Sequence, residues 1–322
     1  MPEDLPSDSS EFGGAERDAS KDLDSVMAER HRLLSLAFRM TGTLADAEDV
    51  VQETYVRWYR LEPEEREKIA VPAAWLTRVA SRISLDFLGS ARARRETYVG
   101  QWLPEPVPAD LFADTPRVPL NSGSLAADPL DRVTLDNTVS MALLTVLEAM
   151  TPAERVAFVL HDVFGVPFDE IAGIVGRSAA ATRQLATSAR RHVRHGRRAQ
   201  VSYLQHDEVV RAFRDATVGG DIVDLLRVLA PGVELRVDGG GVVNAAPQVI
   251  RGSDHVARWF LGVMRKQPAL RLERRYTADG LGYILRIEGR RYGLVTFDVS
   301  DECVTNVWLM LNPMKLTNWS LD

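Results

Sequence analysis

The chain has 322 residues, of which 45% are hydrophobic and 26% are charged, and its formal net charge is −6. This length predicts two or three domains at about 100–200 residues each, and the apolar share is enough for several small cores. The negative charge excludes a protein that coats nucleic acid by overall basicity. The single cysteine, Cys303, excludes a disulfide framework or a cysteine-based zinc site within one chain.

The composition is typical of a cytoplasmic protein. A lone thiol fits a reducing compartment, and no run of roughly 18 uninterrupted apolar residues predicts a membrane span. Residues 1–20 hold six acids and one base, which predicts a disordered acidic tail at 1–21. This tail lacks the basic and apolar segments of a secretory signal. We expect a soluble protein that needs no metal and no cofactor.

The first predicted domain, 22–97, is all-helical. Apolar residues recur there at three- and four-residue spacing. Gly42 is expected to end one helix, Asp46 to cap the next, and Pro72 to begin a longer amphipathic helix that runs to about Glu96. A linker of about thirty residues, 98–130, follows, because repeated prolines exclude a long helix there.

The second predicted domain, 131–199, is also helical, with a capping box at Thr151–Glu154 and a break at Gly176. The third, 203–322, is α+β, because helical patterns are followed by a run of strands. Its helices are expected at about 204–230 and 253–266. Its strands are expected at Val233–Val237, Leu270–Thr277, Leu281–Glu288, Arg291–Val299 and Val304–Leu311.

Residues 169–185 have the form of a helix-turn-helix, with Gly176 in the turn and Ser178 as the cap of the second helix. Six arginines and no acid occupy 182–198, a pattern that neutralises DNA phosphates. Arg183 and Gln184 are best placed to reach bases, whereas arginines further along the helix grip phosphates. The alternative is an ordinary helical pair with a solvated basic face.

Two further helices carry charge patterns of interest. Asp49, Gln52 and Glu53 share a face by their spacing, which indicates either a docking surface for a basic partner or the ordinary preference for acids near a helix start. The helix from Pro72 interleaves basic and aromatic residues, as single-stranded DNA requires. Trp75 in that helix is more simply explained as a core residue.

These residues carry a family resemblance. Residues 46–54 resemble the core-polymerase-binding segment of sigma-70-family proteins. Residues 74–86 resemble the following helix, which melts and reads the minus-ten element. The helix-turn-helix resembles the sigma-4 domain, which reads the minus-thirty-five element. The three segments occur in the family's order.

A narrower resemblance is to extracytoplasmic-function sigma factors with a fused SnoaL-like C-terminal domain. The linker motif of that subfamily is Trp102–Pro106 here, and its two C-terminal motifs read Asp238–Val242 and Asn312–Leu316. Val242 stands where the subfamily usually has lysine, and Met314 where it usually has aspartate. Both departures remove charge, which would alter the contacts between the extension and the sigma domains if those charges set them.

The resemblance implies a role for each set of residues. The set that binds core polymerase is Asp46, Asp49, Gln52 and Glu53. The set near minus-ten DNA is Arg78, Ser81, Arg82, Asp86, Arg92, Arg94 and Arg95. The set at minus-thirty-five DNA is Ser178, Thr182, Arg183, Gln184, Arg190, Arg191 and Arg194. The interdomain regulatory set is Trp102, Leu103, Pro104, Glu105, Pro106, Asp238, Gly239, Gly240, Gly241, Asn312, Pro313, Lys315 and Leu316.

The sequence therefore predicts two all-α domains and a cone-shaped α+β domain of the SnoaL/NTF2-like class. Its predicted function is promoter recognition with core RNA polymerase, modulated by the C-terminal domain, which could hold a small ligand. The rival hypotheses are a small-molecule enzyme or sensor anchored to DNA, and a plain repressor. Acid–base groups for an enzyme would come from Asp254, His255, Tyr276, Tyr283, Tyr292 and Asp298, although none of them has diagnostic spacing.

Overall fold

The computed structural model describes residues 26–96, 98–112, 139–196 and 201–319. We call these the N-terminal helical domain, the linker, the second helical domain and the extension. The predicted acidic tail at 1–21, the prolines from Pro116 to Pro129 and the predicted start of the second domain at 131 lie outside the described residues.

The N-terminal helical domain contains α2 (Arg30–Thr41), α3 (Leu44–Tyr59), α4 (Pro63–Glu67) and α5 (Pro72–Glu96). Gly42 ends α2 with φ of +81°, a conformation that glycine adopts without strain. The prediction that Asp46 caps α3 is wrong. Thr43 is the cap, and its hydroxyl accepts from the backbone N–H of Asp46. The short helix α4 was not predicted.

The second helical domain contains α7 (Met141–Glu148), α8 (Pro152–Phe158), the π-helical turn η1 (Val159–Val163), α9 (Phe168–Val175) and α10 (Ala179–Gly196). The capping box at Thr151 and Glu154 is confirmed. Gly176 ends α9 with φ of +65°, and the Ser178 hydroxyl accepts from the Ala181 N–H at the start of α10. The helix-turn-helix form is therefore confirmed.

The extension begins with α11 (Tyr203–Gly219) and α12 (Ile222–Val228), and α13 (Ser253–Lys266) precedes the last four strands. The strands are β1 (Leu229–Asp238), β2 (Ile250–Arg251), β3 (Leu270–Thr277), β4 (Gly280–Ile287), β5 (Arg290–Ser300) and β6 (Cys303–Met310). Their order is β2-β1-β6-β5-β4-β3, with β1 and β6 parallel and the other pairs antiparallel. The chain ends in two 3₁₀ turns, η2 (Pro313–Lys315) and η3 (Thr317–Trp319).

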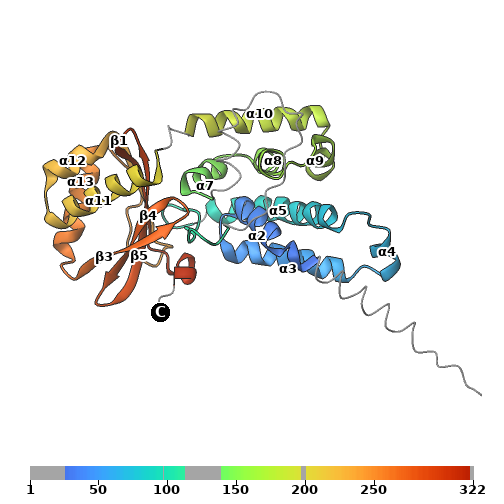
Figure 1. Ribbon diagram of the computed structural model, residues 1–322, viewed down its shortest axis with the longest axis horizontal. Coiled ribbons are helices and arrows are strands. Elements are labelled where there is room, and N and C mark those ends of the chain that lie inside the picture. The colour runs from blue at the N-terminus through green and yellow to red at the C-terminus, as the bar shows by residue number, and fades with distance from the viewer. Residues whose placement is uncertain (1–25, 97, 113–138, 197–200, 320–322) are drawn as a thin grey trace, which may run out of the picture.

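Side chains alternate between the two faces of the sheet along each strand. Both faces are buried, each in its own hydrophobic cluster. In β4, Tyr283 and Leu285 pack with the three helices of the extension, whereas Ile284 points the other way. Ile284, together with Trp308 and Met310 of β6, joins a hydrophobic core that also contains the linker and both helical domains. Figure 1 shows this arrangement, with α11, α12 and α13 on the side of the sheet away from the helical domains.

The linker is a packed segment, although its prolines had predicted only an irregular one. Five consecutive residues, 103–107, are buried. The Val107 carbonyl accepts from the Ala278 N–H, and Pro108 forms a bridge with Thr277 of β3. This stretch thus lies between the extension and the helical domains and is bonded to the sheet.

Candidate interdomain and nucleic-acid interface

A buried ion pair lies where the linker meets the extension. Asp238, at the end of β1, is fully buried, and Lys315 of η2 donates from Nζ to its Oδ2 at 2.8 Å. The same ammonium donates to the Leu103 carbonyl at 2.6 Å, and the Leu103 N–H donates to Asp238 at 2.9 Å. Both charges and the linker backbone therefore satisfy one another, as buried charges require.

The glycines after Asp238 and the residues around Asn312 complete this cluster. The Gly240 N–H donates to Asp238 Oδ1 at 3.0 Å. Gly240 has φ of +67°, and a Cβ there would lie 2.5 Å from the Asn312 side chain, so only glycine fits. Tyr98, which the sequence did not single out, donates to Asp238 and accepts from the Asn312 amide at 2.9 Å. Burial and the hydrogen bond to the Asp238 carboxylate raise the pKa of Tyr98 well above its usual value.

Trp102 lies between Lys315 and Gly42, the residue that ends α2. The Lys315 ammonium is 4.1 Å from the centre of the indole ring, a cation–π distance. A Cβ on Gly42 would lie 2.8 Å from the far edge of the same ring. The indole thus spans from the extension to the N-terminal domain, and the glycine that ends α2 also provides room for it.

Glu105 fastens the other side of the linker to α3. Its Oε2 accepts from the Leu44 N–H at 2.8 Å, at the helix start where N–H groups lack partners. Its own N–H donates to the Gly42 carbonyl, and its Oε1 accepts from the Asn318 amide at 2.9 Å. Trp319 adds a bond from its indole N–H to the Pro106 carbonyl. Burial raises the pKa of Glu105, and these hydrogen bonds and Lys315 oppose the rise.

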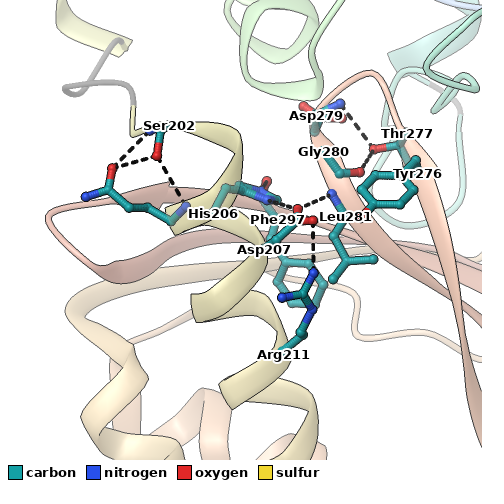
Figure 2. A network of polar contacts seen from close by, with 11 residues as sticks. Ser202, His206, Asp207, Arg211, Tyr276, Thr277, Asp279, Gly280, Leu281 and Phe297 are labelled. Atoms are coloured by element: carbon teal, nitrogen blue, oxygen red, sulfur yellow. Dashed lines mark hydrogen bonds and ion pairs between the residues drawn. The ribbon is translucent and has the colours of Figure 1, made fainter.

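A second contact joins the extension to the second helical domain through the turn between β3 and β4. Asp279 in this turn accepts from the Met141 N–H, the first of α7, at 2.7 Å. Figure 2 shows how α11 holds the turn. Asp207 accepts from the Tyr276 hydroxyl at 2.8 Å and from the Leu281 N–H, and the His206 ring packs against Gly280. No local pattern in the sequence predicts this contact.

Asp279 predicts a pH dependence of stability. Burial raises its pKa to about 8, although the Met141 N–H opposes the rise, and the unfolded value is about 3.9. Between these values the folded chain holds a proton that the unfolded chain has lost, so stability falls as pH rises. We expect the stability of the Asp279→Asn variant to decrease less as pH rises. The measurement is the melting temperature of both proteins from pH 5 to 8.5, and parallel profiles would contradict the assignment.

The predicted core-polymerase face is partly exposed. Asp49 and Gln52 are exposed on α3, Glu53 forms an exposed ion pair with Arg57 at 2.9 Å, and Asp46 is half-buried beside Thr43. The opposite side of α3 packs into the core through Val50, Thr54 and Trp58, among others. Trp75 of α5 is half-buried with its ring centre 5.2 Å from that of Trp58, which agrees with a packing role.

The minus-ten set divides on α5. Arg78, Arg82 and Asp86 are exposed. Ser81 is fully buried and its hydroxyl donates to the Thr77 carbonyl, so in this conformation it contacts no DNA. Arg82 is turned toward the second helical domain, where it donates to the Gly173 carbonyl of α9 at 3.3 Å. The side chains of Arg92, Arg94 and Arg95 lie outside the described part of the chain.

The minus-thirty-five set lies on α10 and the turn before it. Arg183, Gln184, Arg191 and Arg194 are exposed, and the Arg183 guanidinium lies 5.5 Å from the centre of the Phe168 ring. Two residues differ from the expectation. Thr182 is fully buried, and Arg190 donates to Asp162 of η1 at 2.6 Å, which holds its guanidinium against the protein.

The two helical domains pack directly on each other. Arg155 of α8 is 2% exposed and donates to the Met40 carbonyl at the end of α2 at 2.6 Å. It also pairs with Glu148 at 2.7 Å. The guanidinium of Arg39 in α2 lies 5.9 Å from the Phe164 ring centre. The exposed acids of α3 lie outside these contacts, whereas Arg82 of α5 is within them.

Several of the groups considered for acid–base chemistry have local partners of their own. Asp254 pairs with Arg258, His255 bonds to the Arg251 carbonyl, and Asp298 accepts from Thr305 and Asn306. Among the described residues none of the six candidates is hydrogen-bonded to another. In that same part of the chain no three metal-binding side chains are grouped, and no helix is both long and apolar enough to cross a membrane.

An exposed acidic helix, a helix with outward arginines and a helix-turn-helix, in this order on two small helical domains, define a sigma-70-type protein. The Sigma-70 region 2 family matches residues 26–94, and the Sigma-70 region 4 family matches residues 140–193. The ECF RNA polymerase sigma factor SigJ of Mycobacterium tuberculosis is 40% identical over 307 residues, which are 90% of this chain and 91% of that relative. The chain belongs to the extracytoplasmic-function sigma factors.

Two further comparisons agree. The probable ECF RNA polymerase sigma factor SigI of M. tuberculosis is 41% identical over 237 residues, 71% of this chain and 76% of the relative. The crystal structure of M. tuberculosis SigJ superposes with a TM-score of 0.69 at 37% identity and covers 92% of this chain and 98% of that one. The predicted sigma factor function is confirmed, and so is the predicted fold of helical domains followed by an α+β domain.

Proposed function

We propose that this sigma factor binds core RNA polymerase and promoter DNA in the cytoplasm, and that its extension keeps the two helical domains packed together until the promoter is engaged. The observation that carries the proposal is the double attachment of the linker. Asp238 and Lys315 fasten one side of it to the extension, and Glu105 fastens the other side to α3. The linker is thus held in a fixed path between the domains that read DNA.

The packed arrangement cannot read both promoter elements. The minus-ten and minus-thirty-five elements are about 25 base pairs apart, which is roughly 85 Å of duplex at 3.4 Å per base pair. Arg82 of α5 lies 3.3 Å from the Gly173 carbonyl of the helix-turn-helix. The two domains must therefore separate before each can reach its element. The extension regulates initiation by setting the cost of this separation, and it performs no catalysis.

Core polymerase is the partner that meets the packed chain first. Asp49 and Gln52 on α3 are exposed and make no interdomain contact with the described residues, so a basic surface of the polymerase can dock before the domains part. The Glu105 carboxylate of the linker accepts a hydrogen bond at the first turn of α3. Polymerase that docks on α3 therefore competes with this linker contact for the same helix. Charge complementarity of this kind also accelerates encounter.

The Asp49→Lys variant tests the docking face. Reversal of this exposed charge places like charges together at the interface, so we expect at least about tenfold weaker binding to core polymerase. The measurement is affinity for purified core by fluorescence anisotropy of the labelled full chain. Glu64→Lys on α4 is the matched control, because Glu64 is also exposed and lies outside the predicted face. Equal losses in both variants would show only a general charge effect and would contradict the assignment.

A further inference from the structure

The extension has a crevice of about 690 Å³ on its outer side, away from the linker. Its walls come from the C-terminal half of α11, from α13 and from the start of β3. Figure 1 shows these helices on the face of the sheet opposite the helical domains. The volume is in the range of small-molecule sites, and the site is open in the packed chain.

The charged side chains that line the crevice are all positive. Four arginines line it, and they come from three separate elements: Arg214 from α11, Arg258 and Arg265 from α13, and Arg271 from β3. None of the lining residues is an aspartate or a glutamate. This is notable because the whole chain carries more acids than bases. Arginines that converge from different elements raise the local positive potential and favour an anion.

Local structure does not account for all four arginines. Arg214 pairs with Asp215 and Arg258 with Asp254, each on its own helix and outside the crevice lining. Arg265 and Arg271 have no carboxylate partner among the described residues, although Arg271 donates to the Pro268 carbonyl. A helix dipole favours a cation in the last turn of a helix, which explains Arg265 but not Arg271 on a strand.

The remaining lining is largely apolar and includes Leu261, Met264 and Leu272. The interior behind it is filled. The Phe213 ring packs against Phe260 and Phe297 at 5.0 Å between ring centres, and all three are buried. A bound molecule would therefore lie in the crevice and not deeper among these rings. Its body would cover aliphatic side chains while its charged end met the arginines.

We propose that this crevice binds an anionic amphiphile, a small molecule with a carboxylate or phosphate head and an acyl body. The head group accepts from the guanidinium groups of Arg265 and Arg271, which can bind either a carboxylate or a phosphate through two parallel hydrogen bonds. The acyl body packs on Leu261 and Met264. The site is separate from the linker contacts, so the inference does not depend on how the extension regulates initiation.

The test uses the full chain with ¹³C-methyl methionine and titrates decanoate, decyl phosphate and decanol below their aggregation concentrations. We expect saturable binding of the two anions at one site and at least about fivefold weaker binding of the neutral alcohol. The Met264 methyl signal, assigned by Met264→Leu, should shift. The signals of exposed Met27 and Met314 should not. The ratio of decanoate to decyl phosphate affinity identifies which head group the crevice prefers.

Paired variants decide the role of the arginines. Arg265→Gln with Arg271→Gln should weaken decanoate binding by about five- to tenfold. Arg274→Gln with Arg290→Gln, two exposed arginines outside the crevice, should leave it unchanged. Val218→Trp, which fills the crevice from an exposed position, should abolish the Met264 shift. The proposal is overturned if decanol binds as tightly as decanoate, or if both arginine pairs behave alike.

Discussion

Replacement of Lys315 by methionine is expected to lower the free energy of unfolding by about 3–5 kcal/mol, because it leaves the buried Asp238 carboxylate without its charged partner. Asp238 is fully buried and Lys315 is 6% exposed, so water cannot replace the lost ammonium. The Leu103 carbonyl loses a donor as well. The measurement is urea unfolding followed by tryptophan fluorescence.

The design separates this effect from loss of a surface charge. Lys266→Met, at the exposed end of α13, is the matched control and should change stability by less than about 0.5 kcal/mol. Asp238→Asn combined with Lys315→Met should regain part of the loss, because neither buried charge remains, although the one amide oxygen can keep only one of the two N–H donors, Leu103 or Gly240, that meet separate carboxylate oxygens. A Lys315→Met protein as stable as the parent would mean that the ion pair does not hold the linker.

Replacement of Trp102 by alanine is expected to open the packed helical domains. The ring contacts Gly42 and lies 4.1 Å from the Lys315 ammonium. Truncation of this half-buried ring removes about 2–3 kcal/mol of contact. If that contact exists only in the packed form, the ratio of open to packed chains rises by roughly 30- to 150-fold. Transcript yield with core polymerase should rise with it.

Single-molecule energy transfer measures this opening without knowledge of the promoter. Labels at Glu64→Cys and Thr187→Cys, both exposed, report on the two helical domains in a Cys303→Ser background. Trp102→Ala should populate a low-transfer state that the parent lacks. Trp259→Ala, which removes a half-buried tryptophan of α13 away from the linker, should not. Identical transfer distributions for parent and Trp102→Ala would rule out the linker as the fastening.

Local signals predicted most of the elements. The bounds of α13 and β3 agree with those expected from periodicity. Local competition explains the wrong cap of α3, because Thr43 and Asp46 both carry capping side chains and the backbone selected the earlier one. Ser81 and Thr182 were predicted to lie near DNA. Their hydroxyls donate to the backbone carbonyls of Thr77 and Ser178, four residues earlier.

The interdomain contacts were only partly predictable. The motif around Trp102 indicated an interface, yet Tyr98, Asn318, Trp319 and Asp279 carry no local signature and act through partners more than a hundred residues away. Periodicity along one segment cannot reveal such pairs. Periodicity also fails to reveal the pairing of Arg190 with Asp162. This pairing engages a guanidinium that was predicted to contact a DNA phosphate.

The two departures from the subfamily motifs do not reach the ion pair. Val242 is 73% exposed and Met314 is 80% exposed. The cation that meets Asp238 is Lys315, which this chain retains in the second motif. We therefore expect the fastening of the linker to be intact here despite the lost charges. Any effect of the departures falls on the outer surface of the extension.

The central claim is that the extension keeps the helical domains of this sigma factor packed together. Its most direct test is transcription in vitro with purified core polymerase. The template is the DNA upstream of the chain's own gene, and the proteins are the full chain, Asp49→Lys and Trp102→Ala. The account predicts a discrete transcript with the full chain that core alone does not make, less of it with Asp49→Lys and more with Trp102→Ala. A full chain that binds this DNA and core polymerase yet starts no transcript in any of the three forms would contradict the account.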